Sequence, residues 1–241
     1  MMKKLLIAGG VAVVLIVGAV AFLASNLDAI VENAIESLGP EMTGVSVKVS
    51  KVSLALKDGR GEIGGLVVGN PKGFKEPHAF RLGTVVLALD PATVTKDVIV
   101  IRELTIDAPD MAYEKGAGGS NVEVIQRNVD EYVKTHFGGG QSKDKAKKDD
   151  GAQATRFIVE KLQIRNGKVQ LAGVARKDAE VALPPVNMRD LGKSKGGATG
   201  AEIASIIVKQ MTQAAVASAA RALAEEGANR ARESVKGRLG R

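Results

Sequence analysis

The residues that could support catalysis or metal binding are few and widely spaced in this 241-residue chain. It has no cysteine, which excludes a thiolate metal site, a disulfide framework and a cysteine nucleophile. His78 and His136 are the only histidines, and neither has a second histidine at ligand spacing. Asp107 and Asp110 flank a predicted turn, where bonds to neighbouring backbone explain both. We therefore expect no catalytic residue, no metal and no cofactor.

One glycine pattern has the spelling of a dinucleotide-binding loop. Gly59, Gly61 and Gly64 stand at the spacing of that fingerprint. The fingerprint needs a helix directly after the glycines, because the pyrophosphate binds at the helix N-terminus. Here Leu66-Val67-Val68 follows, which predicts a strand. We therefore reject nucleotide binding at this position. The chain also lacks a Gly-x-Ser-x-Gly elbow and a Gly-x-x-x-x-Gly-Lys-Ser/Thr loop, so an enzyme is not expected.

The net charge of +7 raises the question of a nucleic-acid partner. Acidic and basic residues are interleaved along most of the chain, which gives no continuous basic stripe. Aromatic residues make up 3% of the chain, so there is almost nothing on which bases could stack. We expect no nucleic-acid partner.

A repeated strand pattern forms the body of the chain. Residues 157–171 repeat the pattern of residues 98–114 without a gap. In each copy apolar and polar residues alternate, a tight turn follows, and apolar and polar residues alternate again. The corresponding positions are Leu104 and Leu162, Ile106 and Ile164, Met111 and Val169, and Tyr113 and Leu171. The turns fall at Ala108-Pro109-Asp110 and at Asn166-Gly167, which predicts a β-hairpin in each copy. A looser third copy runs from Val52 to Asp58-Gly59.

Three strand segments are apolar on both parities: residues 66–68, 85–89 and 98–101. A strand with one solvated face carries polar residues on one parity, so this pattern predicts that both faces are shielded. A helix can cover one face, and a second sheet, another chain or a lipid would cover the other. Upstream, the apolar parity changes at Ser50-Lys51, which predicts a bulge or a bend.

Three helices are predicted outside the strands. Residues 26–38 form an amphipathic pattern that Asn26 caps and Gly39-Pro40 ends, with the apolar face on the β body and the acidic face in solvent. Residues 120–136 begin with the capping box of Ser120 and Glu123. A similar box at Thr199 and Glu202 begins an Ala-rich helix over residues 201–238, with a possible break near Gly227. Its basic end suits either an anionic membrane surface or a solvated helix terminus.

The N-terminal segment has the composition of a membrane span. Leu5 to Ala24 is a run of uncharged residues that includes Leu5, Leu15 and Phe22, and it is about as long as a bilayer-spanning helix. Lys3 and Lys4 precede it and acidic residues follow it, which places the N-terminus in the cytoplasm. The alternative is a signal peptide cleaved after Ala19-Val20-Ala21. The length of the run favours an uncleaved anchor.

The composition divides the chain into an anchor, two β segments and a helical end. Residues 138–154 are polar, glycine-rich and charged, which predicts a flexible linker or loop. The predicted units are 1–25, the cytoplasmic N-terminus and anchor; 26–137, a β module with flanking helices; 138–154, the linker; 155–191, a second β segment that continues the sheet; and 192–241, a Gly/Lys loop and the Ala-rich helix. The fold class is therefore α+β, an antiparallel, curved sheet of repeated hairpins that helices cover.

The order of these segments resembles the N-terminal part of AsmA-like proteins of Gram-negative bacteria. The resemblance covers residues 1 to about 134 and rests on the anchor followed by GLVVGNPKGF, AFRLGTVVLALD, VIVIRELTIDAPDMAYE and GGSNVEVIQRNV. It implies an inner-membrane anchor and a periplasmic β-structure, whose apolar groove is implicated in moving lipid toward the outer membrane. This chain has too few β units to bridge an envelope.

Two functions follow as hypotheses. In the first, an apolar groove holds lipid acyl chains and is lined by Val86, Ala88, Ile99, Ile101, Leu104, Ile106, Leu162 and Ile164. In the second, helices seal the same strands, and the protein is a structural or adaptor subunit of an envelope assembly without a lipid ligand. The expected partners are the inner membrane and, according to the hypothesis, lipid acyl chains or larger envelope proteins.

Overall fold

The computed structural model describes residues 26–137, 155–173 and 179–239. The predicted anchor, with Leu5, Leu15 and Phe22, and the predicted linker at 138–154 lie outside these residues. Among the described residues, no helix has the length and hydropathy needed to cross a bilayer.

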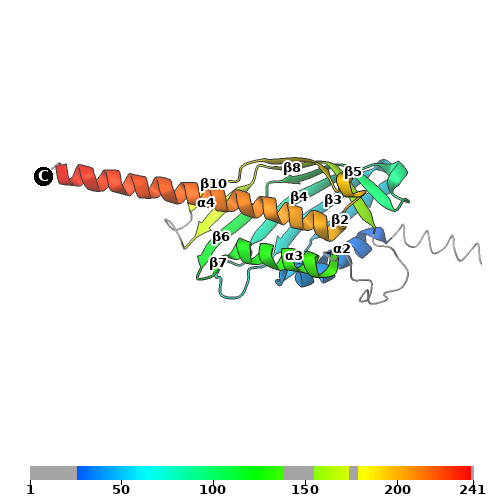
Figure 1. Cartoon of the computed structure of the whole chain (residues 1–241), viewed down its shortest axis with the longest axis horizontal. Coiled ribbons are helices and arrows are strands. Elements are labelled where there is room, and N and C mark those ends of the chain that lie inside the picture. Colours follow the sequence, from blue (N-terminus) through cyan, green and yellow to red (C-terminus); the bar gives the residue numbers. More distant parts are fainter. Residues whose placement is uncertain (1–25, 138–154, 174–178, 240–241) are drawn as a thin grey trace, which may run out of the picture.

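A curved mixed sheet with helices on one face forms the body (Figure 1). The strands are β1 (Val47–Lys48), β2 (Lys51–Ala55), β3 (Arg60–Val68), β4 (Phe80–Leu89), β5 (Val98–Asp107), β6 (Asp110–Gly116), β7 (Gly119–Ser120), β8 (Arg156–Arg165), β9 (Lys168–Ala172), β10 (Ala179–Ala182) and β11 (Val186–Leu191). The helices are α2 (Leu27–Thr43), α3 (Asn121–Phe137) and α4 (Gly200–Leu239), and short 3-10 turns are η1 (Leu56–Asp58), η2 (Pro91–Thr93) and η3 (Lys193–Lys195). The predicted α+β class and the curved sheet are confirmed.

The long strands of the sheet all bend at one level. β4 pairs with β5 at Thr84↔Asp107 and, in the same register, with β6 at Arg81↔Asp110, so β5 and β6 are two arms of one bent strand. The registers of β1/β2, β8/β9 and β10/β11 continue across their breaks in the same way. We call this level the crease. From one edge of the sheet to the other it comprises Ser50, Gly65, Gly83, Ala108, Asn166 and Pro184.

The crease changes which parity of each strand faces the helices. In β5/β6 the buried residues are Leu104 and Ile106 before the crease and Met111 and Tyr113 after it. At three crease positions the residue where the parity changes has a positive φ: 51° at Ala108, 56° at Asn166 and 63° at Gly65. The bend predicted at Ser50-Lys51 is confirmed as the first position of this crease. The three doubly apolar segments lie beside the crease and do not cross it; within residues 85–89 the pairing of β4 with β5 changes register between Ala88 and Leu89.

The two predicted hairpins do not form. β5 pairs in parallel with β8, and β6 in parallel with β9, so that Leu104 lies beside Leu162 and Met111 beside Val169. A two-residue type I′ hairpin needs positive φ at both central residues, whereas Ala108 and Asn166 are each followed by a residue outside that region. The chain therefore bends without reversing, and the sheet is mixed rather than antiparallel. The looser third copy does form an antiparallel pair, β2 with β3.

Ala108 is an alanine in a conformation that favours glycine. Its φ of 51° costs an L-residue free energy that glycine does not lose, and its side chain is exposed. Ala108→Gly is therefore expected to raise the free energy of unfolding by about 0.5–1 kcal/mol. Urea unfolding of the full chain in mild detergent measures this. The matched control is Ala88→Gly in β4, where φ is ordinary and glycine should lower the stability; a loss in both variants would contradict the prediction.

The capping boxes of α3 and α4 form as predicted. The Ser120 N–H and hydroxyl both bond Glu123 Oε2 at 2.7 Å, and the Ser120 N–H in particular holds the pKa of Glu123 below its usual range. Thr199 N–H donates to Glu202 Oε2 at 2.8 Å, and Glu202 N–H donates back to Thr199 Oγ1. α4 then runs through Gly227 without a break.

The orientation of α2 differs in part from the prediction, because Val31 and Ile35 are half-buried whereas Ile30 and Leu38 are exposed. The helix passes through Pro40 and ends at Thr43, and Asn26 makes no side-chain capping bond. Its acidic side faces the sheet: Asp28 Oδ1 accepts the Leu54 N–H at 2.8 Å, and Glu36 Oε1 accepts the Val49 N–H at 3.1 Å. β1/β2 is an edge strand with backbone donors that need partners, and these carboxylates supply them.

The core lies between the sheet and the helices α3 and α4. Val122, Ile125 and Val129 of α3 are fully buried or nearly so. From α4 the cluster receives Ile203, Met211, Ala215 and Ala219. Ala222 is the last residue of α4 that packs against the core, and the helix then projects beyond the sheet (Figure 1).

Candidate functional site

Most of the predicted groove residues lie in the closed core. Ile101, Leu104, Ile106, Leu162 and Ile164 are each at most 7% exposed and belong to one hydrophobic cluster. The same cluster contains the buried residues of α3 and α4. The chain's own helices thus cover the sheet face on which these residues lie.

The remaining predicted groove residues have different surroundings. Val86 is 45% exposed, and Ala88, two residues further along β4, is half-buried. Both alternate with Val85 and Leu87, which pack into the core, so they point away from the helices. Ile99 is half-buried. The structure therefore divides the predicted set between two faces of the sheet, and lipid contact by any of these residues stays a prediction.

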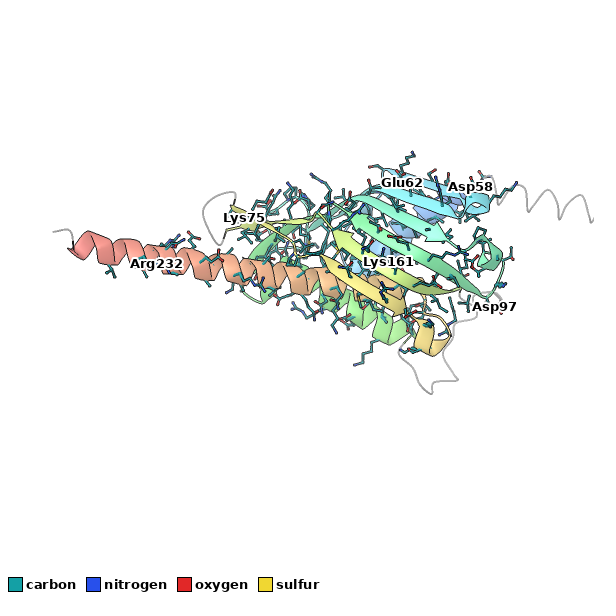
Figure 2. All side chains as sticks on the ribbon, turned by 90° about the horizontal axis from the view of Figure 1, so that it is seen from above. Asp58, Glu62, Lys75, Asp97, Lys161 and Arg232 are labelled. Atoms are coloured by element: carbon teal, nitrogen blue, oxygen red, sulfur yellow. The ribbon has the colours of Figure 1, made fainter. Side chains whose placement is uncertain are left out.

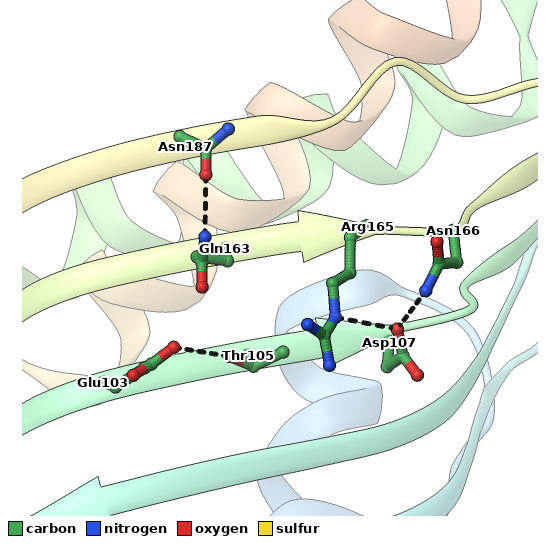
Figure 3. Close-up of polar contacts among 7 residues, drawn as sticks. All are labelled: Glu103, Thr105, Asp107, Gln163, Arg165, Asn166 and Asn187. Atoms are coloured by element: carbon green, nitrogen blue, oxygen red, sulfur yellow. Dashed lines mark hydrogen bonds and ion pairs between the residues drawn. The ribbon is translucent and has the colours of Figure 1, made fainter.

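The face of the sheet away from the helices carries a polar network that links neighbouring strands. Glu103 accepts bonds from Lys161 Nζ and Thr105 Oγ1, each at 3.3 Å. Gln163 Nε2 donates to Asn187 Oδ1 at 3.1 Å (Figure 3). Figure 2 shows side chains along this face, with Glu62 and Lys161 labelled on it. These exposed pairs each contribute little to stability. Together they make this face hydrophilic where β5, β8 and β11 lie side by side.

Asp107 and Asp110 connect the two repeats. Asp107 Oδ1 accepts from Arg165 Nε at 3.0 Å and from Asn166 Nδ2 at 2.7 Å, both on the neighbouring repeat (Figure 3). Asp110 Oδ2 accepts from Gln170 Nε2 at 3.4 Å. The prediction that turn chemistry alone explains both aspartates is therefore wrong. Because the repeats lie side by side, a residue at the bend of one copy is within reach of the bend of the next.

A buried polar cluster, which we call the Asn121 node, fixes the start of α3. Asn121 is fully buried, and its Oδ1 accepts the Glu114 N–H at 2.9 Å. Its Nδ2 donates to the Ala112 carbonyl at 2.7 Å and to Asn70 Oδ1 at 2.9 Å. The Glu114 carboxylate in turn accepts the Lys75 N–H at 2.7 Å. The node thus joins β6, α3 and the loop after β3.

Sequence reasoning missed this node. The available signal was the position of Asn121 directly after the capping serine, together with Asn70 in a loop rich in turn-forming residues. Neither residue type by itself indicates burial, since asparagine and glutamate are mostly exposed. The node is saturated by protein groups, which favours a structural role over a binding role.

His78 is buried, and neither of its ring nitrogens has a hydrogen-bond partner in the described residues. Burial lowers the pKa of His78, with Arg81 acting in the same direction and Asp110 and Glu76 against it. The other histidine, His136, lies in the last turn of α3 and stacks on Tyr132.

Acidification is expected to destabilise the chain through His78. Because its pKa is lower in the folded state than the ordinary 6.5, the unfolded chain binds more protons between the two values. Stability is therefore fully present above pH 6.5 and is lost as the pH falls through the folded pKa. The thermal midpoint should fall less between about pH 7.5 and 5.5 in His78→Gln than in the parent chain. His136→Gln is the control, and an equal effect of both substitutions would contradict the assignment.

Two further features of the described residues do not form a site. No group of three His, Cys, Asp or Glu side chains within the described ranges is placed to hold a metal ion. A surface depression on α3 is lined by Asp130, Glu131, Lys134 and Thr135. A single helix supplies this lining, so residues from different elements do not converge there.

A scan against protein-family models, a search of curated proteins and a search of solved structures gave no match. The AsmA-like resemblance therefore rests on the residues quoted from the sequence.

Proposed function

We propose that this chain is a non-enzymatic structural or adaptor subunit of a bacterial envelope assembly. In this proposal, residues 5–24 anchor it in the inner membrane and the β body lies in the periplasm, as the resemblance to AsmA-like proteins implies. The sheet and its helices form a rigid platform rather than a container for lipid. A larger envelope protein is the proposed partner.

The observation that supports this function is the sealing of the inner face. Leu162 and Ile164, which would line a groove, are at most 1% exposed. Polar bonds also attach α4 on both of its sides: Thr212 Oγ1 donates to the Val122 carbonyl of α3, and Ser218 Oγ donates to the Ala182 carbonyl of β10. Opening this face to an acyl chain would break both the apolar packing and these bonds.

A lipid-holding module is the second candidate. The exposed Val86, with Ala88 beside it, is the observation that favours it, because apolar side chains on the uncovered face are available to a ligand. In this case the acyl chain would lie on the outer face of β4 and not between the sheet and the helices.

Native mass spectrometry of the full chain, released from mild detergent after delipidation, separates the two candidates. The adaptor proposal expects a protein mass without a retained lipid, and an unchanged thermal midpoint after delipidation. One retained lipid per chain, lost in Val86→Ser but kept in the control Thr84→Ser, would overturn the proposal in favour of the second candidate.

A further inference from the structure

The helix α2 has an exposed face that is apolar or uncharged from Ile30 to Leu38 and ends at the exposed, acidic Glu41. Ile30 and Leu38 are 42% and 48% exposed, and they stand two helical turns apart on the same side. Ala34, midway between them, is exposed as well. The neighbouring exposed positions, Asn33 and Ser37, are polar without charge. Large exposed hydrophobic residues are uncommon in the described part of this chain, so two on one helical face form a patch.

The contacts of α2 with the sheet explain why this face is turned outward. Asp28 and Glu36 are bonded to the backbone of the edge strand, and Glu36 Oε2 also accepts from Lys48 Nζ at 3.2 Å. These bonds fix the rotation of the helix about its axis. Asp28 and Glu36 are thus directed toward the edge strand, and the side with Ile30, Ala34 and Leu38 is left exposed, with Glu41 at its C-terminal end.

The position of α2 in the chain indicates what covers this face. Leu5 to Ala24 has the composition of a bilayer span, and α2 begins at Leu27. A helix of 17 residues is about 25 Å long. Figure 1 shows that α2 begins at one end of the body, whereas the projecting end of α4 points the other way. If the run spans the bilayer, α2 starts at the membrane surface.

We propose that the exposed face of α2 lies in the membrane interface, with Ile30, Ala34 and Leu38 among the acyl chains next to the headgroups. This inference rests on the anchor in the proposed function. An interfacial helix is expected to insert by about 5–10 Å. The face carries no lysine or arginine and ends at the acidic Glu41, so the recognised chemistry is the apolar interface of a zwitterionic bilayer and not an anionic headgroup.

A second copy of the chain fits this face less well. Two large apolar side chains on one helix cover far less than the roughly 1,000 Å² that a stable interface between proteins needs. A membrane contact needs less intrinsic affinity, because the preceding span would hold α2 at the surface and make the insertion intramolecular. The short connection between residue 24 and α2 therefore favours lipid.

The chain has no tryptophan, so a single introduced one reports its own surroundings. Ile30→Trp and Leu38→Trp are to be compared with Val86→Trp, which has similar exposure on the opposite part of the body. Each full chain is reconstituted into phosphatidylcholine vesicles whose acyl chains are brominated either near the headgroup or near the chain end. Both α2 variants should be quenched by bromine, more strongly by the shallow position, and Val86→Trp should not.

Quenching of the α2 variants no greater than that of Val86→Trp would overturn the inference. Blue-shifted emission that rises with the protein-to-lipid ratio without bromine quenching would overturn it in favour of a second copy. Flotation of the same vesicles tests the anchor separately: a chain that does not float overturns both proposals. A chain that floats but is not quenched overturns only the interfacial position of α2. Unchanged thermal midpoints show that the variants are folded.

Discussion

Leu162→Ala is expected to lower the free energy of unfolding by about 3–4 kcal/mol, because a fully buried leucine leaves a cavity in addition to its lost transfer energy. Leu162 lies between Leu104 of β5 and Met188 of β11, under the helices. These neighbours are held by the sheet and cannot close the space. Pulse proteolysis in urea, on the full chain in mild detergent, measures the change.

The control for Leu162→Ala is Val86→Ala, on the uncovered face. Its side chain is 45% exposed, so its truncation should change the stability by no more than about 0.5 kcal/mol. The comparison also bears on function. If Leu162→Ala changed the stability as little as Val86→Ala does, the inner face would not be a packed core, and the proposed adaptor role would lose its main support.

Asn121→Ala is expected to lower the free energy of unfolding by about 3 kcal/mol, because it leaves buried backbone groups without partners. The Glu114 N–H loses its acceptor and the Ala112 carbonyl loses its donor. The loop that holds Asn70 also loses one of its attachments to β6 and α3. The same proteolysis measurement applies. Loop cleavage near Asn70 should also become faster under native conditions.

Asn128→Ala is the matched control, about two helical turns further along α3. Asn128 is partly buried, and its Nδ2 donates to the Thr43 carbonyl at 2.8 Å. Its loss should lower the stability by about 1 kcal/mol. Equal effects of the two asparagine substitutions would show that the Asn121 node does not carry the connection between β6, α3 and the loop.

Local signals in the sequence were sufficient for the capping boxes and the bends. Ser120 with Glu123 and Thr199 with Glu202 form their bonds within three residues, so no distant contact can change them. Asn166 has the positive φ that its residue type favours. The bend at Ser50 followed from the change of apolar parity alone. In each case the deciding interaction lies within a few residues of the signal.

The facing of α2 could not be read from its amphipathic pattern. The pattern correctly separated an apolar side from an acidic side, but only part of the apolar side turns toward the protein. The Val49 and Leu54 N–H groups of the edge strand draw the acidic residues toward the sheet, and their need for acceptors depends on which strand lies at the edge. Which strand lies at the edge is decided by the pairing of the whole sheet.

By itself, the sequence determined the long strands, the three helices, the capping boxes of α3 and α4, and the repeat, including the pairs Leu104 with Leu162 and Met111 with Val169. Only the tertiary structure decided that these pairs are neighbours in parallel strands rather than equivalent positions of separate hairpins. Apolar and polar residues that alternate before and after a turn are expected in a hairpin and in a bent strand alike. The difference is made by the strand that lies alongside, which is β4 for the first repeat, β5/β6, and β5/β6 for the second repeat, β8/β9. Such contacts join residues far apart in the chain. The same long-range packing of α3 and α4 closes the face that the apolar pattern suggested for lipid.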